Sequence, residues 1–333
     1  MHIVHIYKDY FPILGGIENH LRALAEGQAA RGHRVTVLVT NTTNQEQRSE
    51  QGNLTIIKAA RRFHAASTPL SPAMLRHASA LKDVELVHLH FPFPPGDLAA
   101  LVVPGAPPLV VSYHSDIVRQ QSLLLAYRPL QELTLRRAAR IISYSPDYIR
   151  SSPVLRRFAA KCRVAPLSVA VERFATLDSS RVAELRNRYN NDVDTTLLLF
   201  VGRLRYYKGL HVLLEALARC RRPAQLLLVG IGPEEARLRA QRDALGLSTQ
   251  VYFLGEVDDV ELPLIYAASD VFVLPSHLRA EGFGIVQIEA QAAGLPTICT
   301  ELGTGTSYVT QHAVTGIVVP PADADAFAKP RRP

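Results

Sequence analysis

The chain contains few of the residues that mark secreted or membrane-spanning proteins. Its 333 residues include three cysteines (Cys162, Cys220 and Cys299), none of them in a Cys-x-x-Cys pair. Neither a disulfide framework nor a structural zinc site is therefore expected, and we interpret each cysteine as a small buried side chain in a reducing compartment. No basic segment opens the sequence, and proline or charge interrupts each apolar stretch before the roughly 20 residues of a bilayer span. A secreted or integral membrane protein is not expected.

Aromatic side chains are also scarce, at 7% with no tryptophan, and no run of lysine and arginine alternates with stacking residues. Nucleic acid is therefore not expected as a partner. With 47% apolar and 20% charged residues, the composition is that of an ordinary globular protein. The length suggests about two domains.

Positive charge is concentrated in the first half of the chain. Residues 1–170 hold 20 Lys and Arg against 11 Asp and Glu, whereas residues 171–333 hold 17 against 19. The first half therefore has an excess of nine positive charges, and the second half has an excess of two negative ones. An anionic membrane surface or a phosphate-bearing substrate would explain a basic half, and a plain solvated surface is the alternative.

Short β-type runs alternate with helical patterns in both halves, which predicts an α/β protein with parallel sheets covered by helices. Strands are expected at 2–7, 34–40, 85–91, 108–114, 140–145 and 162–166, then at 196–204, 225–232, 250–255, 270–275 and 296–300. We predict an N-terminal Rossmann-like domain at 1–170, an interdomain segment at 171–194 and a C-terminal Rossmann-like domain at 195–333. Two such doubly wound domains facing a central cleft would bind ligands at the carboxyl ends of their strands.

Two loops at predicted strand ends are suited to phosphate. Gly15 and Gly16 precede a predicted helix, so backbone N–H groups can approach an anion there, although a tight turn without a ligand has the same pattern. Arg203 and Lys208 lie on the loop after the first strand of the second half, just before another helix. The segment VGIGPEE (229–235) lacks the third glycine of a dinucleotide-binding motif, which disfavours an NAD site.

Glu281 and Glu289 lie on either side of a predicted loop-to-helix junction. Gly282 and Gly284 permit a sharp turn between them, and Glu289 falls in the first turns of the following helix. Two carboxylates so placed can hold separate hydroxyl groups of one sugar-containing ligand. A solvated helix face is the alternative for such a pair.

Six motifs occur in order along almost the whole chain: GGIE (15–18), SYHSD (112–116), VGRLRYYKG (201–209), VGIGP (229–233), E-G-F-G-x4-E (281–289) and ELGTGTSYVTQHAVTGIVVPP (301–321). The set resembles the retaining GT-B glycosyltransferases of glycosyltransferase family four. The segments YHSDIVRQ (113–120) and YRPLQ (127–131) and the sequence GTGTS are similar to those of bacterial mannosyl- and rhamnosyltransferases that build lipid-linked polysaccharides.

The resemblance implies a role for each matching residue. The implied catalytic residues are His114, Arg203, Lys208 and Glu281, and the implied donor-binding residues are Gly15, Gly16, Glu289, Gly303, Thr304, Gly305 and Thr306. The two cations would neutralise the donor diphosphate, Glu281 would hold hydroxyl groups of the transferred sugar, and His114 would lie beside that sugar. Glu289 would bind the ribose, and the two glycines of the first half would approach the phosphate. His88 and His90 match no motif, and we interpret them as satisfied histidines of the core or the cleft edge.

The resemblance also implies the chemistry and the partners. Cations beside the departing phosphate lower the barrier most directly. Front-face attack, in which the leaving phosphate oxygen takes the acceptor proton, requires no paired acid and base carboxylates. Arg203 and Lys208 take the place of a divalent metal, so neither a metal nor a cofactor is expected. The expected partners are a nucleotide-diphosphate sugar such as GDP-mannose, a lipid-linked or other glycan acceptor, and an anionic membrane surface on the cytoplasmic side.

The chain departs from the family pattern at its end. Family chains continue after the VVPP segment through further helices, the last of which crosses back onto the first domain. This sequence stops at AFAKPRRP (326–333), so the crossing helices are expected to be missing. Two alternatives to a transferase are a sugar-nucleotide epimerase or phosphorylase on the same fold, and a shortened, inactive nucleotide-binding protein.

Overall fold

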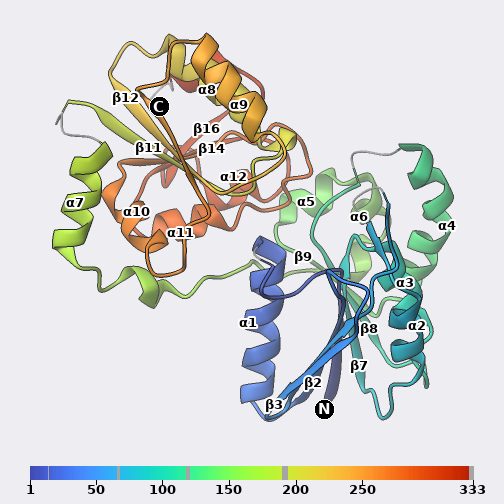
Figure 1. Ribbon diagram of the computed structural model, residues 1–333. Coiled ribbons are helices and arrows are strands. Elements are labelled where there is room, and N and C mark those ends of the chain that lie inside the picture. The colour runs from blue at the N-terminus through green and yellow to red at the C-terminus, as the bar shows by residue number, and fades with distance from the viewer. Residues whose placement is uncertain (14, 66–67, 118–120, 190–193, 330–333) are drawn as a thin grey trace. The chain divides into compact units, whose positions relative to one another are not determined.

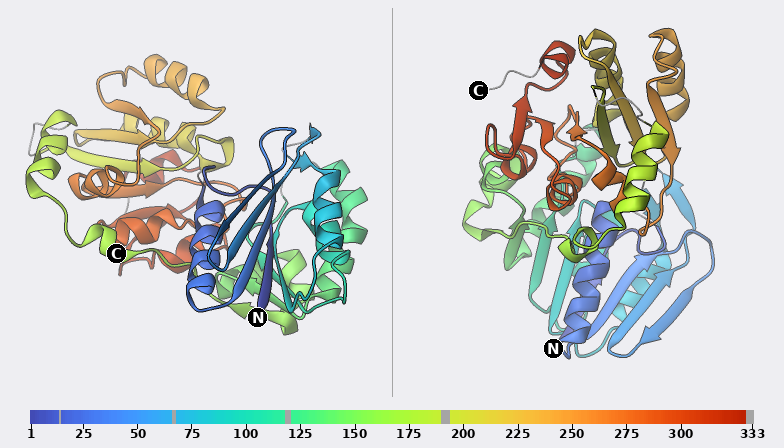
Figure 2. Two further views of the ribbon diagram at one scale, coloured as in Figure 1. Left: turned by 60° about the horizontal axis from the view of Figure 1, so that its bottom comes forward. Right: turned by 90° about the vertical axis from the view of Figure 1, so that its left-hand side faces the viewer.

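The computed structural model describes the chain except for residues 14, 66–67, 118–120, 190–193 and 330–333. It divides into two compact units, Met1–Pro166 and Leu167–Pro333, each built on its own sheet (Figures 1 and 2). The ends of the YHSDIVRQ motif, of the expected interdomain segment and of the chain itself lie outside the described residues. No helix of the described part combines the length and the apolar character that crossing a membrane requires.

The first unit has an eight-stranded, mainly parallel sheet. Its strands are β1 (His2–Ile6), β2 (Arg34–Thr40), β3 (Gln47–Gln51), β4 (Leu54–Ala59), β7 (Leu86–Phe91), β8 (Leu109–Tyr113), β9 (Arg140–Ser143) and β10 (Cys162–Val164). They lie in the order β10-β9-β8-β7-β1-β2-β4-β3, and only β3 is antiparallel to its neighbour. A separate ribbon pairs β5 (Phe63–Ala65) with β6 (Thr68–Leu70).

Three helices of the first unit begin at a Ser-Pro pair. The helices of this unit are α1 (Gly16–Ala30), α2 (Pro72–Ser79), α3 (Pro94–Leu101), α4 (Gln121–Arg137), α5 (Pro146–Ser151) and α6 (Pro153–Arg157). The hydroxyl groups of Ser71, Ser145 and Ser152 accept backbone N–H groups at the starts of α2, α5 and α6. Proline fits the first helical position because its missing N–H has no partner there anyway.

The second unit has a six-stranded, wholly parallel sheet. Its strands are β11 (Thr196–Val201), β12 (Ala224–Val229), β13 (Val251–Gly255), β14 (Val271–Leu274), β15 (Thr297–Thr300) and β16 (Gly316–Val319). The order β13-β12-β11-β14-β15-β16 is the doubly wound order 3-2-1-4-5-6. Successive strands are added on one side of β11 up to β13 and on its other side from β14 onward, so the switch point lies between β11 and β14. Its helices are α7 (Ser179–Tyr189), α8 (Leu210–Arg219), α9 (Glu235–Ala244), α10 (Leu262–Ala268), α11 (Val286–Ala292), α12 (Thr306–Val309) and α13 (Ala324–Ala328).

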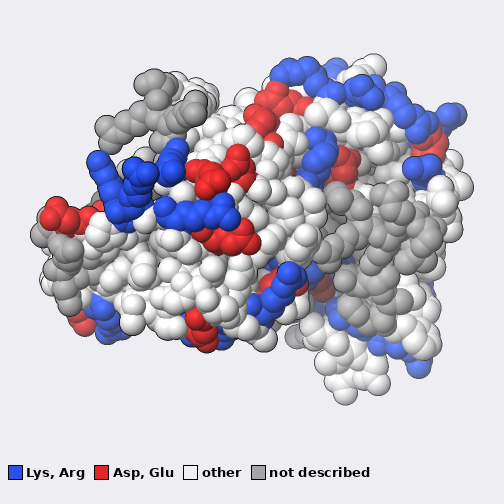
Figure 3. Space-filling model, turned by 90° about the horizontal axis from the view of Figure 1, so that it is seen from above, with Lys and Arg blue, Asp and Glu red and all other residues white. Residues whose placement is uncertain are grey.

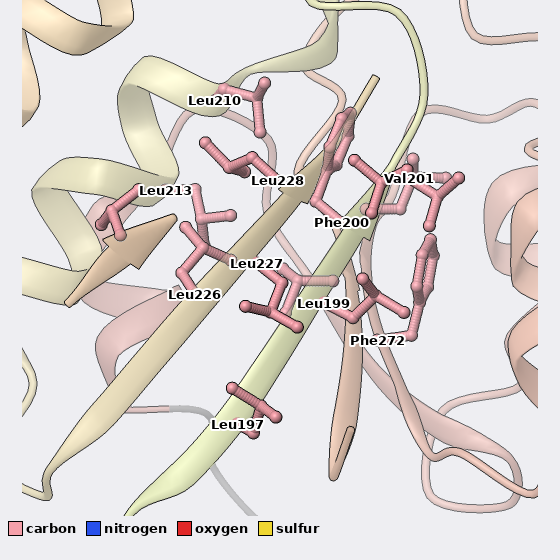
Figure 4. Close-up of a cluster of buried hydrophobic side chains, with 14 of the residues drawn as sticks. Leu197, Leu199, Phe200, Val201, Leu210, Leu213, Leu226, Leu227, Leu228 and Phe272 are labelled. Atoms are coloured by element: carbon pink, nitrogen blue, oxygen red, sulfur yellow. The ribbon is translucent and has the colours of Figure 1, made fainter. Parts of the chain in front are cut away.

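Leucine-rich strands form the core of the second unit. Side chains of β11 and β12 pack against α8 (Figure 4), and Leu199, Phe200 and Leu228 are completely buried. Such near-continuous apolar strands are typical of a parallel sheet covered on both faces. At the edge of this unit, Arg186 of α7 bonds both carboxylate oxygens of Asp270 at 2.9 and 3.1 Å, so α7, within the expected interdomain segment, packs on the second unit.

The predicted α/β class with two doubly wound units is therefore confirmed. The alternation had not identified the polar strand β3, its neighbour β4 or the last strand β16. Two short 3-10 helices also belong to the second unit. One, η2 (Val171–Phe174), lies at its start, and the other, η3 (Tyr206–Lys208), follows β11.

Candidate active site

A buried ion pair joins the loop after β11 to the loop after β14, the two neighbouring strands between which the strand order of the second sheet reverses. Lys208 ends η3, after β11, and Glu281 lies in the loop after β14. Lys208 Nζ lies 2.6 Å from Glu281 Oε2, and each side chain is only 9% exposed. Burial alone would lower the pKa of the Lys208 ammonium, but the Glu281 carboxylate beside it raises that pKa above its usual value. Open α/β sheets bind ligands at this switch point, so the pair lies where a ligand is expected.

Glu281 keeps one oxygen available for a ligand. The Ser276 hydroxyl donates to Glu281 Oε2 at 2.9 Å, the same oxygen that meets Lys208. Among the described residues, Oε1 has no hydrogen-bond partner. The Thr300 hydroxyl in turn donates to the backbone oxygen of Ser276, which ties this loop to the end of β15. The carboxylate is therefore held at one oxygen and can accept a sugar hydroxyl at the other.

Arg203 lies on the same loop as Lys208 and is exposed. Within the described part of the chain, its guanidinium forms no hydrogen bond or ion pair. The VGIGP segment packs directly on this loop, because a Cβ at Gly230 would lie 2.3 Å from the Gly202 oxygen and a Cβ at Gly232 equally close to the Leu204 oxygen. The glycines of VGIGP thus allow the two loops to approach each other closely.

Glu289 lies in the first turn of α11, as predicted, and is half-buried. The Tyr266 hydroxyl of α10 donates to Glu289 Oε2 at 2.9 Å. Burial raises the pKa of Glu289, and the bond from Tyr266 opposes that rise.

The segment Gly303–Thr306 contacts the loop that carries Glu281. The Gly305 N–H donates to the Gly282 oxygen at 2.8 Å, and a Cβ at Gly305 would lie 2.4 Å from Phe283, so a larger residue does not fit. Thr304 and Thr306 are buried, and the Thr306 hydroxyl donates to the backbone oxygen of Thr300 at 2.8 Å. The segment therefore lies beside the Glu281 loop, and its implied role in donor binding stays a prediction.

Sequence reasoning missed three residues that organise these loops. Arg279 donates to the Leu302 oxygen at 3.0 Å and so joins the two loops. Glu301 accepts the Gly303 N–H at 2.7 Å and the Ser307 hydroxyl at 3.0 Å. Ser276, the third, holds Glu281. Each lies within or beside a motif, but the spacing alone does not indicate which neighbour it contacts.

In the first unit, Gly15 and Gly16 lie at the start of α1, as predicted. Glu18, in the first turn, is buried, and its carboxylate lies over Gly15, where a Cβ would come within 2.2 Å of Oε2. An acidic group therefore lies beside this helix start. Whether the glycines approach a phosphate stays a prediction.

His114 follows β8 and is buried in a group of histidines. His114 Nε2 lies 3.0 Å from His90 Nδ1, and His114 Nδ1 lies 2.7 Å from the Tyr144 hydroxyl. Burial lowers the pKa of His114 well below its usual value. His88 and His90 are buried and hydrogen-bonded as well, the former to Ser112 at 2.8 Å, which agrees with the interpretation of satisfied histidines.

Three histidines of this group, His5, His88 and His90, bring ring nitrogens within 4.8 Å of one another. Neutral imidazoles at such distances can bind a transition metal. However, His5 Nδ1 and His90 Nε2 already face each other in a hydrogen bond of 3.2 Å, and His88 Nε2 and His90 Nδ1 have partners of their own in Ser112 and His114. Hydrogen bonding therefore explains this group better than metal binding does.

An apolar cavity of about 680 Å³ lies at the other edge of the second sheet. Its lining includes Thr196, Val271 and Thr297, the first residues of β11, β14 and β15. Lys208 and Glu281 lie beyond the carboxyl ends of these strands, so the cavity is separate from the candidate site. The loops of the second unit bring together Lys208, Glu281 and Gly303–Thr306, whereas His114 and the two glycines belong to the first unit.

Comparisons with known proteins agree with this arrangement. Residues 14–173 match the family model "Glycosyltransferase Family 4", and residues 182–330 match "Glycosyl transferases group 1". The chain is 38% identical over 331 residues to O-antigen chain mannosyltransferase C of Escherichia coli, covering 99% of this chain and 87% of that protein. It is also 38% identical to the D-rhamnosyltransferase WbpZ of Pseudomonas aeruginosa, covering 100% and 86%.

Solved structures show the same fold. Sucrose-phosphate synthase from Thermosynechococcus elongatus is 25% identical, with a TM-score of 0.80, covering 98% of this chain and 88% of that one. HepE of Anabaena, solved with UDP-glucose, is 21% identical with a TM-score of 0.77, covering 99% and 88%. The comparisons do not favour the epimerase, the phosphorylase or an inactive binding protein. The chain belongs to glycosyltransferase family four, and it is a GT-B glycosyltransferase that moves a sugar from a nucleotide-sugar donor to a glycan acceptor.

Proposed function

We propose that the protein transfers mannose from GDP-mannose to a lipid-linked saccharide, with retention of the anomeric configuration. The 38% identity to an O-antigen chain mannosyltransferase over almost the whole chain carries this proposal. A GDP-mannose-dependent mannosyltransferase of phosphatidylinositol mannosides from Mycolicibacterium smegmatis is 30% identical over 97% of the chain, which supports the same donor.

The second unit supplies the charges that such a transfer needs. When the bond between the anomeric carbon and the diphosphate breaks, negative charge grows on the phosphate. Arg203, exposed and without a partner among the described residues, would meet that charge directly. Lys208 would meet it from a fixed position, because Glu281 holds its ammonium at 2.6 Å. Glu281 Oε1 would accept a hydroxyl of the mannose, and Glu289 would accept the ribose hydroxyls.

Two cations at the diphosphate would make a divalent metal unnecessary. We therefore expect transfer to continue within about twofold in excess EDTA, because the two side-chain cations would stabilise the departing phosphate in place of a metal. Loss of turnover in EDTA and recovery with Mg²⁺ would contradict this part of the proposal.

The test is a transfer assay with GDP-mannose, GDP-rhamnose and UDP-glucose, using a lipid-linked saccharide as acceptor. Arg203→Ala should lower kcat/KM for GDP-mannose by about 10²–10³-fold, the usual effect of removing one charge-stabilising group. Glu281→Gln should lower it by at least 10-fold. Arg222→Ala removes an exposed cation at the amino end of β12 and serves as the control. Near-full turnover by both site variants would show that this loop pair is not the transfer site.

An anionic membrane surface would bring the enzyme to such an acceptor. Residues 132–163 contain eight Lys and Arg against two Asp and Glu. We call the exposed cations of this segment the basic face: Arg136, Arg140, Arg150, Arg156, Arg157 and Arg163. Figure 3 shows groups of Lys and Arg side chains, with Asp and Glu among them, on the side of the protein that it draws. Each cation near an anionic bilayer adds about 1 kcal/mol of attraction.

Vesicle sedimentation tests the membrane surface. The protein should bind vesicles with 30% anionic lipid in 50 mM salt and release them in 500 mM salt, because salt screens this attraction. The double variant Arg156→Glu/Arg163→Glu should bind at least 10-fold less. Arg221→Glu/Arg222→Glu, on the second unit, is the matched control. Equal binding of the wild type to neutral vesicles would overturn this part of the proposal.

A further inference from the structure

A series of hydrogen bonds, here called the histidine chain, runs through the first unit from α1 to the end of β9. Gln28 Oε1 lies 2.7 Å from His5 Nε2, and His5 Nδ1 lies 3.2 Å from His90 Nε2. His90 Nδ1 then lies 3.0 Å from His114 Nε2, and His114 Nδ1 lies 2.7 Å from the Tyr144 hydroxyl. His5, His90 and His114 come from or follow the neighbouring strands β1, β7 and β8, so the parallel sheet itself sets their spacing.

One arrangement of protons satisfies these four contacts of the histidine chain. Gln28 Oε1 can only accept, so His5 Nε2 carries a proton. A neutral imidazole has a single N–H, so His5 Nδ1 must accept from His90 Nε2. The same step leaves His90 Nδ1 to accept from His114 Nε2, and His114 Nδ1 to accept from the hydroxyl of Tyr144. All three histidines are then Nε2–H tautomers.

Burial keeps these imidazoles neutral. His5 and His90 are completely buried, and His114 is 5% exposed. Burial lowers the pKa of His5 to about 4 and holds the pKa of His90 and His114 well below the usual value. A protonated member would place two donors face to face, which the sequence of contacts does not allow.

We propose that His90 and Tyr144 are positioning residues of the transferase, which fix His114 as the Nε2–H tautomer and hold its ring in one orientation. This inference rests on the proposed function, and on the role beside the transferred sugar that the family resemblance implies for His114. Each ring nitrogen of His114 has a hydrogen-bond partner, His90 on one side and Tyr144 on the other, so the ring cannot turn. The backbone that follows His114 is therefore held in one conformation.

Contacts further along the same loop support this assignment. Asp116, two residues after His114, accepts hydrogen bonds from Tyr113 at 2.9 Å and from Ser152 at 2.7 Å. The Asp116 N–H donates to the Tyr148 hydroxyl. His114 and Asp116, near the start of the loop after β8, are thus both held by hydrogen bonds, and the histidine chain supplies the first of these two anchors.

The tautomers can be measured on the whole wild-type protein. In protein labelled with ¹⁵N at histidine, the Nδ1 of His114 should show the shift of an unprotonated nitrogen and Nε2 that of an N–H. The variant His114→Gln assigns the His114 signals, because they are absent from its spectrum. A protonated Nδ1 on His114 would overturn the inference, because the chain would then run in the opposite direction.

Kinetics separate positioning from packing. Tyr144→Phe should lower kcat about 10- to 100-fold and change KM for the donor less than about twofold, since a misplaced group slows the reaction without removing the nucleotide contacts. His90→Gln keeps a donor and an acceptor and should retain more activity than His90→Phe, which keeps the ring alone. A packing role predicts the reverse order, and that order would overturn the inference.

Tyr10→Phe is the matched control for Tyr144→Phe. Tyr10 is buried in the same unit, and its hydroxyl has no hydrogen-bond partner among the described residues. Its variant should keep wild-type kcat. If the wild type transfers no sugar, the proposed function fails and the ¹⁵N shifts still decide the direction of the chain. If the wild type is active and Tyr144→Phe is unchanged, the inference itself fails.

Discussion

At the scale of single residues, one buried carboxyl makes the stability of the first unit depend on pH. Asp97 of α3 is completely buried and accepts a hydrogen bond from Tyr127 of α4. Burial raises the pKa of Asp97 to about 7, and the bond from Tyr127 partly offsets that rise. Because the pKa of Asp97 in the folded state exceeds that in the unfolded chain, its contribution to the unfolding free energy is complete below about pH 4. It is lost as the pH rises through 7.

Asp97→Asn should therefore gain stability relative to the wild type as the pH rises. The pKa difference corresponds to a gain of about 2–3 kcal/mol in unfolding free energy between pH 5 and pH 8. Urea unfolding at both pH values measures it. Asp147→Asn, on the surface of the same unit, is the control. A difference between Asp97→Asn and wild type that stays constant with pH would contradict the prediction.

The buried pair of the donor loops should be coupled in stability as well as in activity. Lys208→Met leaves the Glu281 carboxylate buried without its cation, which should cost about 3 kcal/mol of unfolding free energy. Lys208→Met/Glu281→Gln removes both charges and should recover at least half of that loss, although neither variant should turn over. Denaturant unfolding of the two single variants and the double variant completes the cycle. Additive losses would mean that the two side chains do not depend on each other.

At the scale of elements, Gly209 joins the Lys208 loop to α8 and tests how tightly that junction is packed. Its φ of +71° favours glycine, and a Cβ there would lie 1.9 Å from the Pro275 backbone oxygen. Gly246 has a similar φ of +70° but no atom within 4 Å of its Cβ position. The two glycines therefore share the backbone strain and differ in the contact.

Gly209→Ala should accordingly destabilise the protein by about 2–4 kcal/mol and raise KM for the donor several-fold, because the backbone of Pro275 must shift. Gly246→Ala should cost about 1 kcal/mol and leave KM unchanged. Thermal unfolding and donor kinetics of the two variants provide the comparison. Equal effects would show that the strain alone matters and that the loops can separate.

The sequence predicts elements well where burial imposes a pattern and poorly where it does not. Strand β11 is apolar from its second residue, Leu197, to its end, so its existence follows from composition alone. Strand β3 is QRSEQ, every residue of it exposed, and it forms because β4 offers it an edge. No periodic signal accompanies such a strand. Its existence follows from the neighbouring strand and could not be predicted from its own residues.

The candidate site shows the same division. Lys208 and Glu281 were assigned to one site by resemblance, and the structure brings them to 2.6 Å. That Glu281 holds the ammonium depends on the distance between two loops, because Lys208 and Glu281 lie 73 residues apart in the sequence. That Ser276 shares the same carboxylate oxygen depends on the conformation of the Glu281 loop itself. The histidine chain depends likewise on the register of β1 and β7, in which His5 lies opposite His88. Register of this kind is set by the whole sheet and is not contained in any single motif.

At the scale of the whole molecule, the two units should respond differently to nucleotide. The proposed diphosphate ligands Arg203 and Lys208 both belong to Leu167–Pro333, whereas the basic face belongs to Met1–Pro166. GDP at about 100 times its dissociation constant adds about 2.7 kcal/mol to a unit that binds it when folded. Because Arg203 and Lys208 lie in the second unit, its backbone should become more protected than that of the first unit.

Hydrogen exchange read segment by segment measures this difference in the full chain. Amides of β11 and β12 should exchange roughly 100-fold more slowly with GDP, if they exchange by unfolding of their unit, and amides of β1 and β7 should change far less. Arg203→Ala, which removes a ligand without disturbing the core, should abolish most of the effect. UDP should protect less than GDP if the donor is GDP-mannose. Slower exchange in the first unit alone would instead place the nucleotide on the basic half, and the excess positive charge there would then belong to donor binding.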